Sequence, residues 1–306
     1  MRVFVTGATG FIGQAVVQEL LGAGHKVIGL ARSEKSAAAL EAKGAEAIRG
    51  SIEDIESLKR GANESDGVIN LAFNHDFTKY EDNIKAELNA VKAIGSTLVG
   101  TNKPFVITLG TLVLPKGQLA AEDAKINYED ALNARAICER EVDSLASQGV
   151  RASVVRLSPT VHGPGDRAFI YMLAQIAREK GVSAYIGEGL NRWPAVHRLD
   201  AARLFRLAVE KGTPGARYHA VAEEEIPFKD IAQALGKSPG LPIVSISNDE
   251  AITHFNGFLG SLVSVDNPSS SKKTQETLGW TPSESALLDD IHSGIYKEET
   301  GASISV

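Results

Sequence analysis

Short apolar runs and segments of helical periodicity alternate along the first half of the chain. Residues 3–5 are apolar, and after a glycine-rich turn apolar residues recur at the spacing of one helix face over residues 11–21. The same alternation predicts strands at 3–5, 26–31, 45–50, 66–73, 104–111 and 153–157, with helices at 11–21, 35–43 and 80–98. Strands and helices in this order predict an α/β fold, a doubly wound parallel sheet with helices on both faces.

The pattern changes at about residue 166. We expect Asp166 and Arg167 to begin a helix that continues to residue 178, and Asp200 to cap a helix that ends at 209. Further helices are predicted at 227–235, at 249–262 and within 269–280, where serines cap the helix and a glycine stops it before Trp280. Extended segments are predicted at 184–187 and 193–197, and a loose tail from about 297. The sequence thus predicts a main domain of residues 1–165 plus about 195–222, and a small discontinuous C-terminal annex of residues 166–194 and 223–306.

A glycine-rich turn joins the first strand to the first helix. Gly7, Gly10 and Gly13 have the spacing G-x-x-G-x-x-G. Gly7 is expected to make the turn, Gly10 to let the backbone approach a phosphate, and Gly13 to let the helix pack closely on the strand. The amides and the positive dipole end of a helix N-terminus suit a diphosphate. A purely structural turn is the alternative, but the strand–turn–helix context favours a dinucleotide site in a Rossmann-type sheet.

The end of the second strand bears on the choice of cofactor. It carries Arg32 and Ser33, with Lys35 close behind and no carboxylate before Glu34. Sites for NAD usually place an acid here for the ribose 2′-hydroxyl, whereas an arginine accommodates a 2′-phosphate. We therefore predict that NADPH is preferred over NADH. The alternative is that Arg32 is only a solvated loop cation.

Composition narrows the class of protein. The 306 residues are 43% hydrophobic with a net charge of −6, which argues against nucleic acid or an anionic membrane as the main partner. The sequence has no apolar run long enough for a membrane span and no signal-peptide pattern, so we expect a cytoplasmic protein. The single cysteine, Cys138, is expected to pack in the core. The seven histidines show no metal-ligand spacing, and no metal is expected.

Several stretches, in order along nearly the whole chain, resemble the short-chain dehydrogenase/reductase superfamily, in its extended and atypical forms that include sugar-nucleotide epimerases and dehydratases. The matching stretches are residues 6–13, 70–72, 108–111, 156–163, 196–200 and 278–282. The resemblance implies cofactor contacts from Gly7, Thr9, Gly10, Phe11, Ile12, Gly13, Arg32, Ser33, Ser51, Ile52, Leu71, Ala72 and Pro159. For Ile52 and Asp54, contact with adenine and simple helix capping stay equally open. The resemblance also implies a possible homodimer.

The catalytic residues that the resemblance implies are only partly present. Family members use a serine or threonine that positions the substrate oxygen, a tyrosine that moves the proton, and a lysine four residues later. Thr111 matches the first role. Alignment on Glu139 puts Ala131 in place of the tyrosine and Arg135 in place of the lysine. The six tyrosines, at 80, 128, 171, 185, 218 and 296, have no lysine four residues downstream. The usual proton donor is therefore absent.

Three explanations for the missing donor stay open. Another side chain, Tyr128, His162 or Tyr171, supplies the proton; or water does; or the protein binds NADP without turning it over. We prefer an NADP-dependent oxidoreductase that reduces a small carbonyl or enone compound, with Thr111 orienting the oxygen and Arg135 holding the cofactor. The competing hypothesis is a catalytically silent NADP-binding sensor or regulator. A nucleotide-sugar epimerase or dehydratase is a third, disfavoured because that chemistry also needs a proton mover.

Overall fold

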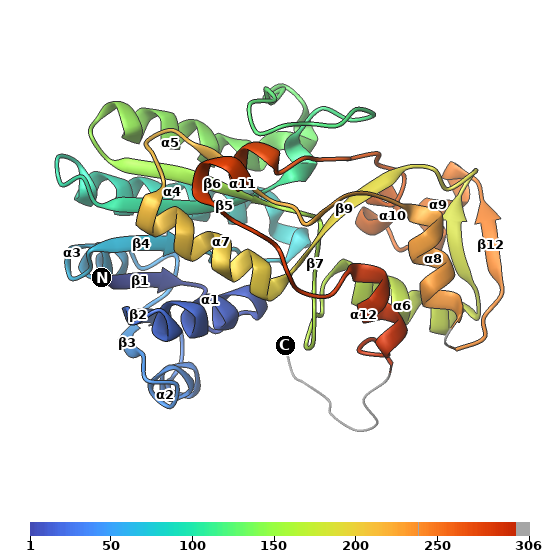
Figure 1. Cartoon of the computed structure of the whole chain (residues 1–306), viewed down its shortest axis with the longest axis horizontal. Coiled ribbons are helices and arrows are strands. Elements are labelled where there is room, and N and C mark those ends of the chain that lie inside the picture. Colours follow the sequence, from blue (N-terminus) through green and yellow to red (C-terminus); the bar gives the residue numbers. More distant parts are fainter. Residues whose placement is uncertain (238, 298–306) are drawn as a thin grey trace.

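A seven-stranded parallel sheet forms the centre of the molecule. The computed structural model describes residues 1–237 and 239–297, so the tail expected from about 297 lies almost wholly outside the described residues. The strands lie in the order β10-β6-β5-β4-β1-β2-β3, with every pair parallel, and Figure 1 labels β6 to β3 of this order. The strands are β1 (Arg2–Thr6), β2 (Lys26–Ala31), β3 (Glu46–Arg49), β4 (Gly67–Asn70), β5 (Pro104–Gly110), β6 (Arg151–Leu157) and β10 (Arg217–Ala220).

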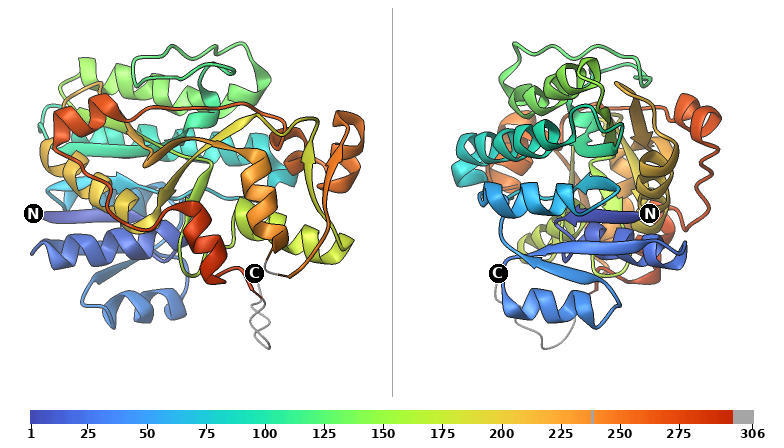
Figure 2. Two further views of the ribbon diagram at one scale, coloured as in Figure 1. Left: turned by 45° about the vertical axis from the view of Figure 1, so that its right-hand side comes forward. Right: turned by 90° about the vertical axis from the view of Figure 1, so that its left-hand side faces the viewer.

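Helices cover both faces of this sheet, as the right-hand view of Figure 2 shows. Buried side chains of one face come from α1 (Phe11–Gly22), α2 (Glu34–Glu41), α7 (Arg198–Lys211) and the end of α11 (Lys272–Leu278). Those of the other face come from α3 (Ile55–Asn63), α4 (Tyr80–Leu98) and α5 (Ile137–Ser147). Strands such as β1, with Val3, Phe4 and Val5 fully buried, are apolar on both sides because both sides are covered. The predicted doubly wound α/β fold is confirmed.

A smaller annex lies beyond the carboxyl ends of the central strands (Figure 1). It has its own cluster of buried side chains, which includes Trp193 and Phe228 with ring centroids 5.1 Å apart. Its strands are β7 (Thr160–His162), β8 (Ser183–Ile186), β9 (Arg192–His197), β11 (Glu223–Pro227) and β12 (Ile243–Ile246), which form the sheets β11-β9-β7 and β12-β8. Its helices are α6 (Phe169–Lys180), α8 (Phe228–Lys237), α9 (Asn248–His254), α10 (Phe258–Leu262) and α12 (Leu287–Ser293). The annex is confirmed, while the residue boundaries between the two parts stay a prediction.

Helix α7 begins earlier than predicted. Its first residue is Arg198, and His197 is the N-cap, because the His197 ring accepts a hydrogen bond from the Leu199 amide. The expectation that Asp200 caps this helix is therefore wrong. Asp200 is buried in the first turn, where its carboxylate accepts hydrogen bonds from the amides of Ser283 and Glu284. The acid anchors a distant segment, which local sequence could not indicate.

Two further element boundaries differ from the prediction. Helix α6 begins at Phe169, because the buried Asp166 carboxylate instead accepts hydrogen bonds from the Ala168 amide and the Tyr296 hydroxyl. The helix predicted at 249–262 is two helices, α9 and α10. Asn256 and Gly257 between them have φ angles of 58° and 64°, the left-handed region that interrupts a helix. Among the described residues, no helix is long and apolar enough to cross a membrane.

Candidate cofactor and active site

The sheet order places the glycine-rich turn at the point where the chain reverses direction across the sheet. Strand β1 lies between β2 and β4, so the connections from β1 and from β3 leave toward opposite edges. Open α/β sheets bind ligands in the crevice outside the carboxyl ends of the strands at such a switch point. The residues that follow β1 and β4 therefore line the expected ligand position.

The backbone of the turn requires glycine at specific positions. Gly7 has a φ angle of +65°, and a Cβ atom there would lie 2.9 Å from the Ala72 amide nitrogen. A Cβ atom on Gly13 would lie 2.0 Å from the carbonyl oxygen of Gly7, so only glycine lets α1 approach the turn this closely. Gly10, exposed at the N-cap of α1, donates its amide to the Gly7 carbonyl at 3.0 Å. Thr9 is exposed beside it, and Phe11 and Ile12 are partly buried at the helix start.

The end of β4 is tied to this turn by side-chain hydrogen bonds. Thr6 Oγ1 accepts from the Ala72 amide at 3.1 Å and donates to Asn70 Oδ1 at 2.7 Å. Asn70 Nδ2 is buried and has no hydrogen-bond partner among the described residues. Leu71 and Ala72 thus lie directly against Gly7. A cradle that a Cβ atom would fill, beside an unpaired buried donor, fits a dinucleotide.

The residues expected around the adenosine half gather at the ends of β2 and β3. Arg32 is exposed and makes no hydrogen bond or ion pair within the described part of the chain. Ser33 caps α2, since its side chain accepts from the Ser36 amide. The Glu34 carboxylate is already paired, because Arg49 donates two hydrogen bonds to it, at 2.8 and 2.7 Å. This pairing holds the pKa of Glu34 below its ordinary value.

The remaining expected cofactor residues lie at the same edge of the sheet. Ser51 and Ile52 follow β3 and are partly buried, with Ser51 Oγ accepting from the Glu53 amide at 3.2 Å. Asp54 caps α3 by accepting from the Ser57 amide, so the capping alternative for Asp54 is confirmed. Pro159 is partly buried in the short connection between β6 and β7. Contact between Ile52 and the adenine ring stays a prediction.

Thr111 begins a short 3₁₀ helix, η2 (Thr111–Val113), directly after β5. It is fully buried, and its hydroxyl donates to Asn267 Oδ1 at 2.9 Å. Asn267 in turn donates from Nδ2 to the Thr111 carbonyl at 3.0 Å. This reciprocal pair fixes the orientation of the threonine and connects the sheet edge to a segment 156 positions later.

Arg135 lies in a second 3₁₀ helix, η3 (Ala131–Ala136), which precedes α5. Its Nε and Nη2 atoms each donate to one oxygen of the buried Glu87 carboxylate, both at 2.7 Å. Nη2 also donates to the Thr108 carbonyl at 3.3 Å, and the guanidinium carbon lies 4.0 Å from the centre of the Phe73 ring. The Nη1 atom makes no hydrogen bond to the described residues and is the part of Arg135 left for a ligand.

The three candidate proton donors do not share one environment. Tyr128 is 39% exposed, and the Arg140 guanidinium lies 5.0 Å from its ring centre. Tyr171 lies on α6, in the annex, and the guanidinium carbon of Arg167 lies 4.4 Å from the centre of its ring. His162, at the end of β7, is fully buried. The structure also gathers two titratable residues that the sequence did not single out, since His75 and Tyr80 both contact the Phe73 ring under Arg135.

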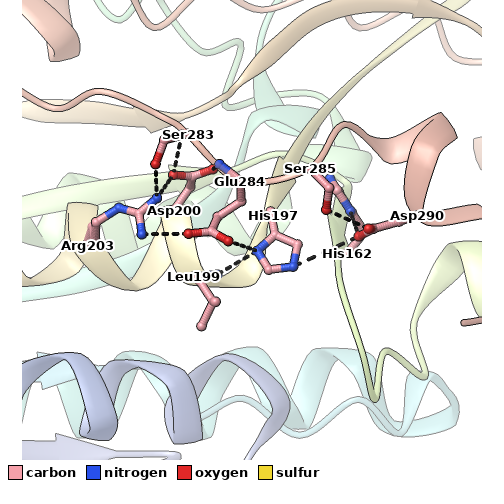
Figure 3. Close-up of polar contacts among 9 residues, drawn as sticks. All are labelled: His162, His197, Leu199, Asp200, Arg203, Ser283, Glu284, Ser285 and Asp290. Carbon is pink, nitrogen blue, oxygen red and sulfur yellow. Dashed lines mark hydrogen bonds and ion pairs between the residues drawn. The ribbon is translucent and has the colours of Figure 1, made fainter. Parts of the chain in front are cut away.

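His162 belongs to a hydrogen-bonded cluster that joins the annex to the start of α7 (Figure 3). Its Nδ1 atom lies 2.7 Å from Asp290 Oδ2, while Ser285 donates to the other carboxylate oxygen at 2.5 Å. His197 Nε2 lies 3.9 Å from the same carboxylate. Burial lowers the pKa of the His162 imidazole, although Asp290 opposes this shift. The Nε2 atom of His162 is buried without a partner among the described residues.

Sequence reasoning missed Glu87 and Asn267, which bind the two expected catalytic residues. The sequence does contain an indication for Glu87, because this acid lies on the apolar face of α4 together with Ile84, Val91 and Ile94. An acid on such a face indicates a buried ion pair. The sequence contains no such indication for Asn267, since its partner Thr111 is remote in sequence.

Cys138 is fully buried, and burial raises the pKa of its thiol, which confirms its predicted packing role. Throughout residues 1–237 and 239–297, no group of three or more histidine, cysteine, aspartate or glutamate side chains could hold a metal ion.

Comparison with known proteins shows the family to which the chain belongs. The model of the NAD dependent epimerase/dehydratase family matches residues 3–221. An uncharacterized protein of Schizosaccharomyces pombe is 52% identical over 97% of this chain and 100% of its own length. A 2-alkyl-3-oxoalkanoate reductase of Stenotrophomonas maltophilia is 28% identical over 83% of this chain and 79% of its own. The structure of a dTDP-glucose 4,6-dehydratase from Streptomyces venezuelae, solved with NAD bound, aligns over 96% of both chains with a TM-score of 0.78 and 18% identity. With the glycine-rich turn at the switch point and the family match over most of its length, the chain belongs to the NAD dependent epimerase/dehydratase family.

Proposed function

We propose that the protein is an NADP-dependent oxidoreductase that reduces a small carbonyl or enone compound. The observation that carries the proposal is the glycine cradle at the switch point, with Thr111 and Arg135 at the same edge of the sheet. The relative named as a 2-alkyl-3-oxoalkanoate reductase supports a carbonyl substrate. In this proposal the protein acts in the cytoplasm, as a homodimer, with the nucleotide held by residues 1–165 and about 195–222.

The preference for NADP rests on Arg32 and on the state of Glu34. Arg32 is exposed and has no partner among the described residues, so its guanidinium is available to a 2′-phosphate. The acid nearest to the strand end, Glu34, is already paired with Arg49. An acid held in this way is a poor acceptor for the 2′-hydroxyl of NAD.

Replacing Arg32 by alanine is expected to weaken NADPH binding about tenfold or more and NADH binding only slightly, because a charge-assisted hydrogen bond to the 2′-phosphate is lost. The quenching of tryptophan fluorescence on titration with each nucleotide measures both affinities. Lys26→Ala, which removes an exposed charge from the other end of β2, is the matched control and should change neither affinity. Equal losses for NADPH and NADH in Arg32→Ala contradict the proposed NADP preference.

The residues of the chain have separate tasks in the proposed reaction. The bound nicotinamide supplies the hydride. Thr111 orients the substrate oxygen after exchanging its hydrogen bond to Asn267, and Arg135 binds the nicotinamide ribose through Nη1. The proton comes from Tyr128, His162, Tyr171 or water. An arginine is too weakly acidic to supply it.

The proposed activity is tested by a screen of ketones, aldehydes and enones with NADPH, followed by the loss of nicotinamide absorbance. Thr111→Ala is expected to lower kcat at least about a hundredfold, the effect of losing one oriented donor to a developing oxyanion. Thr111→Ser keeps the hydroxyl and should retain most of the activity, so it separates the loss of the donor from the loss of packing. An active Thr111→Ala variant contradicts the role of Thr111.

A catalytically silent NADP-binding regulator is the second candidate function. It is favoured by the fact that the Thr111 hydroxyl and two of the three Arg135 side-chain nitrogens are already bonded within the protein. Tight NADPH binding without turnover across the whole panel would establish it. A nucleotide-sugar epimerase or dehydratase is less well supported, because alanine at 131 cannot move a proton.

A further inference from the structure

Among the described residues Arg198 has no ion-pair partner, and it lies against Phe11, the residue that follows Gly10 of the glycine-rich turn. It is the first residue of α7, is partly buried, and its guanidinium carbon lies 5.1 Å from the centre of the Phe11 ring. Its Nε atom is buried without a hydrogen-bond partner, and within the described residues the side chain forms no ion pair. Because Phe11 is the first residue of α1, this charge lies against a side chain from the N-terminal end of that helix.

The position of Arg198 is unfavourable for stability in the absence of a ligand. A positive charge in the first turn of a helix is opposed by the helix dipole, and a buried donor without an acceptor costs free energy. The other charges near the start of α7 are already paired. Asp200 binds the side chain of Arg203, which also donates to Glu284 at 2.8 Å (Figure 3), and among the described residues Arg198 forms no ion pair with either acid.

The surroundings hold Arg198 in this position. His197 caps the helix, and Trp280 donates to the Asp200 carbonyl at 3.0 Å, which fixes the first turn of α7. The loop after β7 also lies against this turn. Gly163 has a φ angle of +130°, and a Cβ atom there would lie 2.6 Å from His197 Nε2 and 3.4 Å from Arg198 Cγ. A Cβ atom on Gly165 would lie 3.9 Å from Arg198 Nη1. Glycine at 163 therefore lets the loop approach α7 closely, next to the cation.

We propose that Arg198 binds the diphosphate of the dinucleotide from the side opposite the amides of α1. This inference rests on the proposed function, since it requires a bound dinucleotide. A diphosphate would supply both the missing acceptor and the missing negative charge, and guanidinium groups bind phosphate oxygens through strong, charge-assisted hydrogen bonds. The first thirteen residues contain no acid that could compete for Arg198. Recognition of the diphosphate thus involves α7 as well as the glycine-rich turn.

The test compares Arg198→Gln with the unaltered protein in titrations with NADPH, NADH and ADP-ribose. All three ligands contain an adenosine and a second ribose joined by the diphosphate, but ADP-ribose lacks the nicotinamide and only NADPH has the 2′-phosphate. All three dissociation constants are expected to rise roughly ten- to hundredfold, the loss typical of a charge-assisted hydrogen bond. Arg198→Lys should recover part of the affinity. Lys211→Gln removes an exposed charge from the last turn of the same helix and should change nothing. Without ligand, the thermal midpoint of Arg198→Gln should equal or exceed that of the unaltered protein.

The possible outcomes separate this inference from the proposed function. If the unaltered protein binds the ligands and Arg198→Gln binds them equally well, the inference is wrong and the proposed function stands. A loss confined to NADPH would place Arg198 at the 2′-phosphate, and a loss absent for ADP-ribose would place it at the nicotinamide half; either overturns the inference. If the unaltered protein binds none of the ligands, the proposed function fails and the inference fails with it.

Discussion

The substitution Gly13→Ala is expected to lower the affinity for NADPH at least about a hundredfold, which corresponds to about 2.7 kcal/mol. The added methyl group would lie 2.0 Å from the carbonyl oxygen of Gly7, well inside van der Waals contact. Relief of this overlap moves α1 away from the turn, and the amides that are expected to bind the diphosphate move with it. Fluorescence titration with NADPH measures the loss, and thermal unfolding shows whether the variant still folds.

The matched control is Gly22→Ala, at the last residue of the same helix. A Cβ atom there meets no atom within 4 Å, so binding should be unchanged and stability should rise by about 0.5–1 kcal/mol because alanine favours helix. Unaltered NADPH affinity in a folded Gly13→Ala protein would show that the close approach of α1 to the turn does not serve cofactor binding.

The substitution Glu139→Gln is expected to lower the free energy of unfolding by about 3–5 kcal/mol, the cost of breaking a buried ion pair. Glu139 is 1% exposed and accepts two hydrogen bonds from Arg156, at 3.0 and 2.5 Å, and one from Arg217 at 2.8 Å. Arg156 lies 3.1 Å from the ring of His219, whose pKa is lowered to about 3 by burial and by Arg156. The substitution leaves the buried Arg156 guanidinium without its carboxylate partner, whereas Arg217 keeps its ion pair with Asp143.

Urea denaturation monitored by circular dichroism measures this loss. Glu34→Gln is the control, because it breaks the exposed pair with Arg49 and should leave the urea midpoint nearly unchanged. If the two variants lower the midpoint by the same amount, the network around Glu139 does not stabilise the junction of α5, β6 and β10.

Much of the cofactor half of the site could be predicted because it depends on local rules. Gly7, Gly10 and Gly13 are separated by two residues each, and the conformation they impose is decided within one turn and one helix start. Strands β1, β4 and β5 are largely apolar runs because they are buried on both faces, so their limits in the structure fall within a few residues of the prediction. Membership of the family follows from the same stretches.

The catalytic half could not be predicted in the same way, because its partners are remote in sequence. Arg135 has the charge of the expected lysine, but its binding to Glu87 depends on how α4 packs beside η3. Asp200 is of a residue type that commonly caps a helix. Its carboxylate instead accepts hydrogen bonds from two amides more than eighty residues away, and these bonds anchor the segment before α12.

The sequence by itself determined the α/β fold, the glycine-rich turn and the absence of the tyrosine and lysine pair. These properties depend on residue type and on the spacing of residues close together in the sequence, and both directly determine local backbone conformation. Only the tertiary structure decided which polar groups have partners: Thr111 and Arg135 are bonded within the protein, while Arg198 lies beside Phe11 without an ion-pair partner in the described part of the chain. The physical reason is that a hydrogen bond or an ion pair depends on distances of a few ångströms, and for residues far apart along the chain folding alone sets those distances.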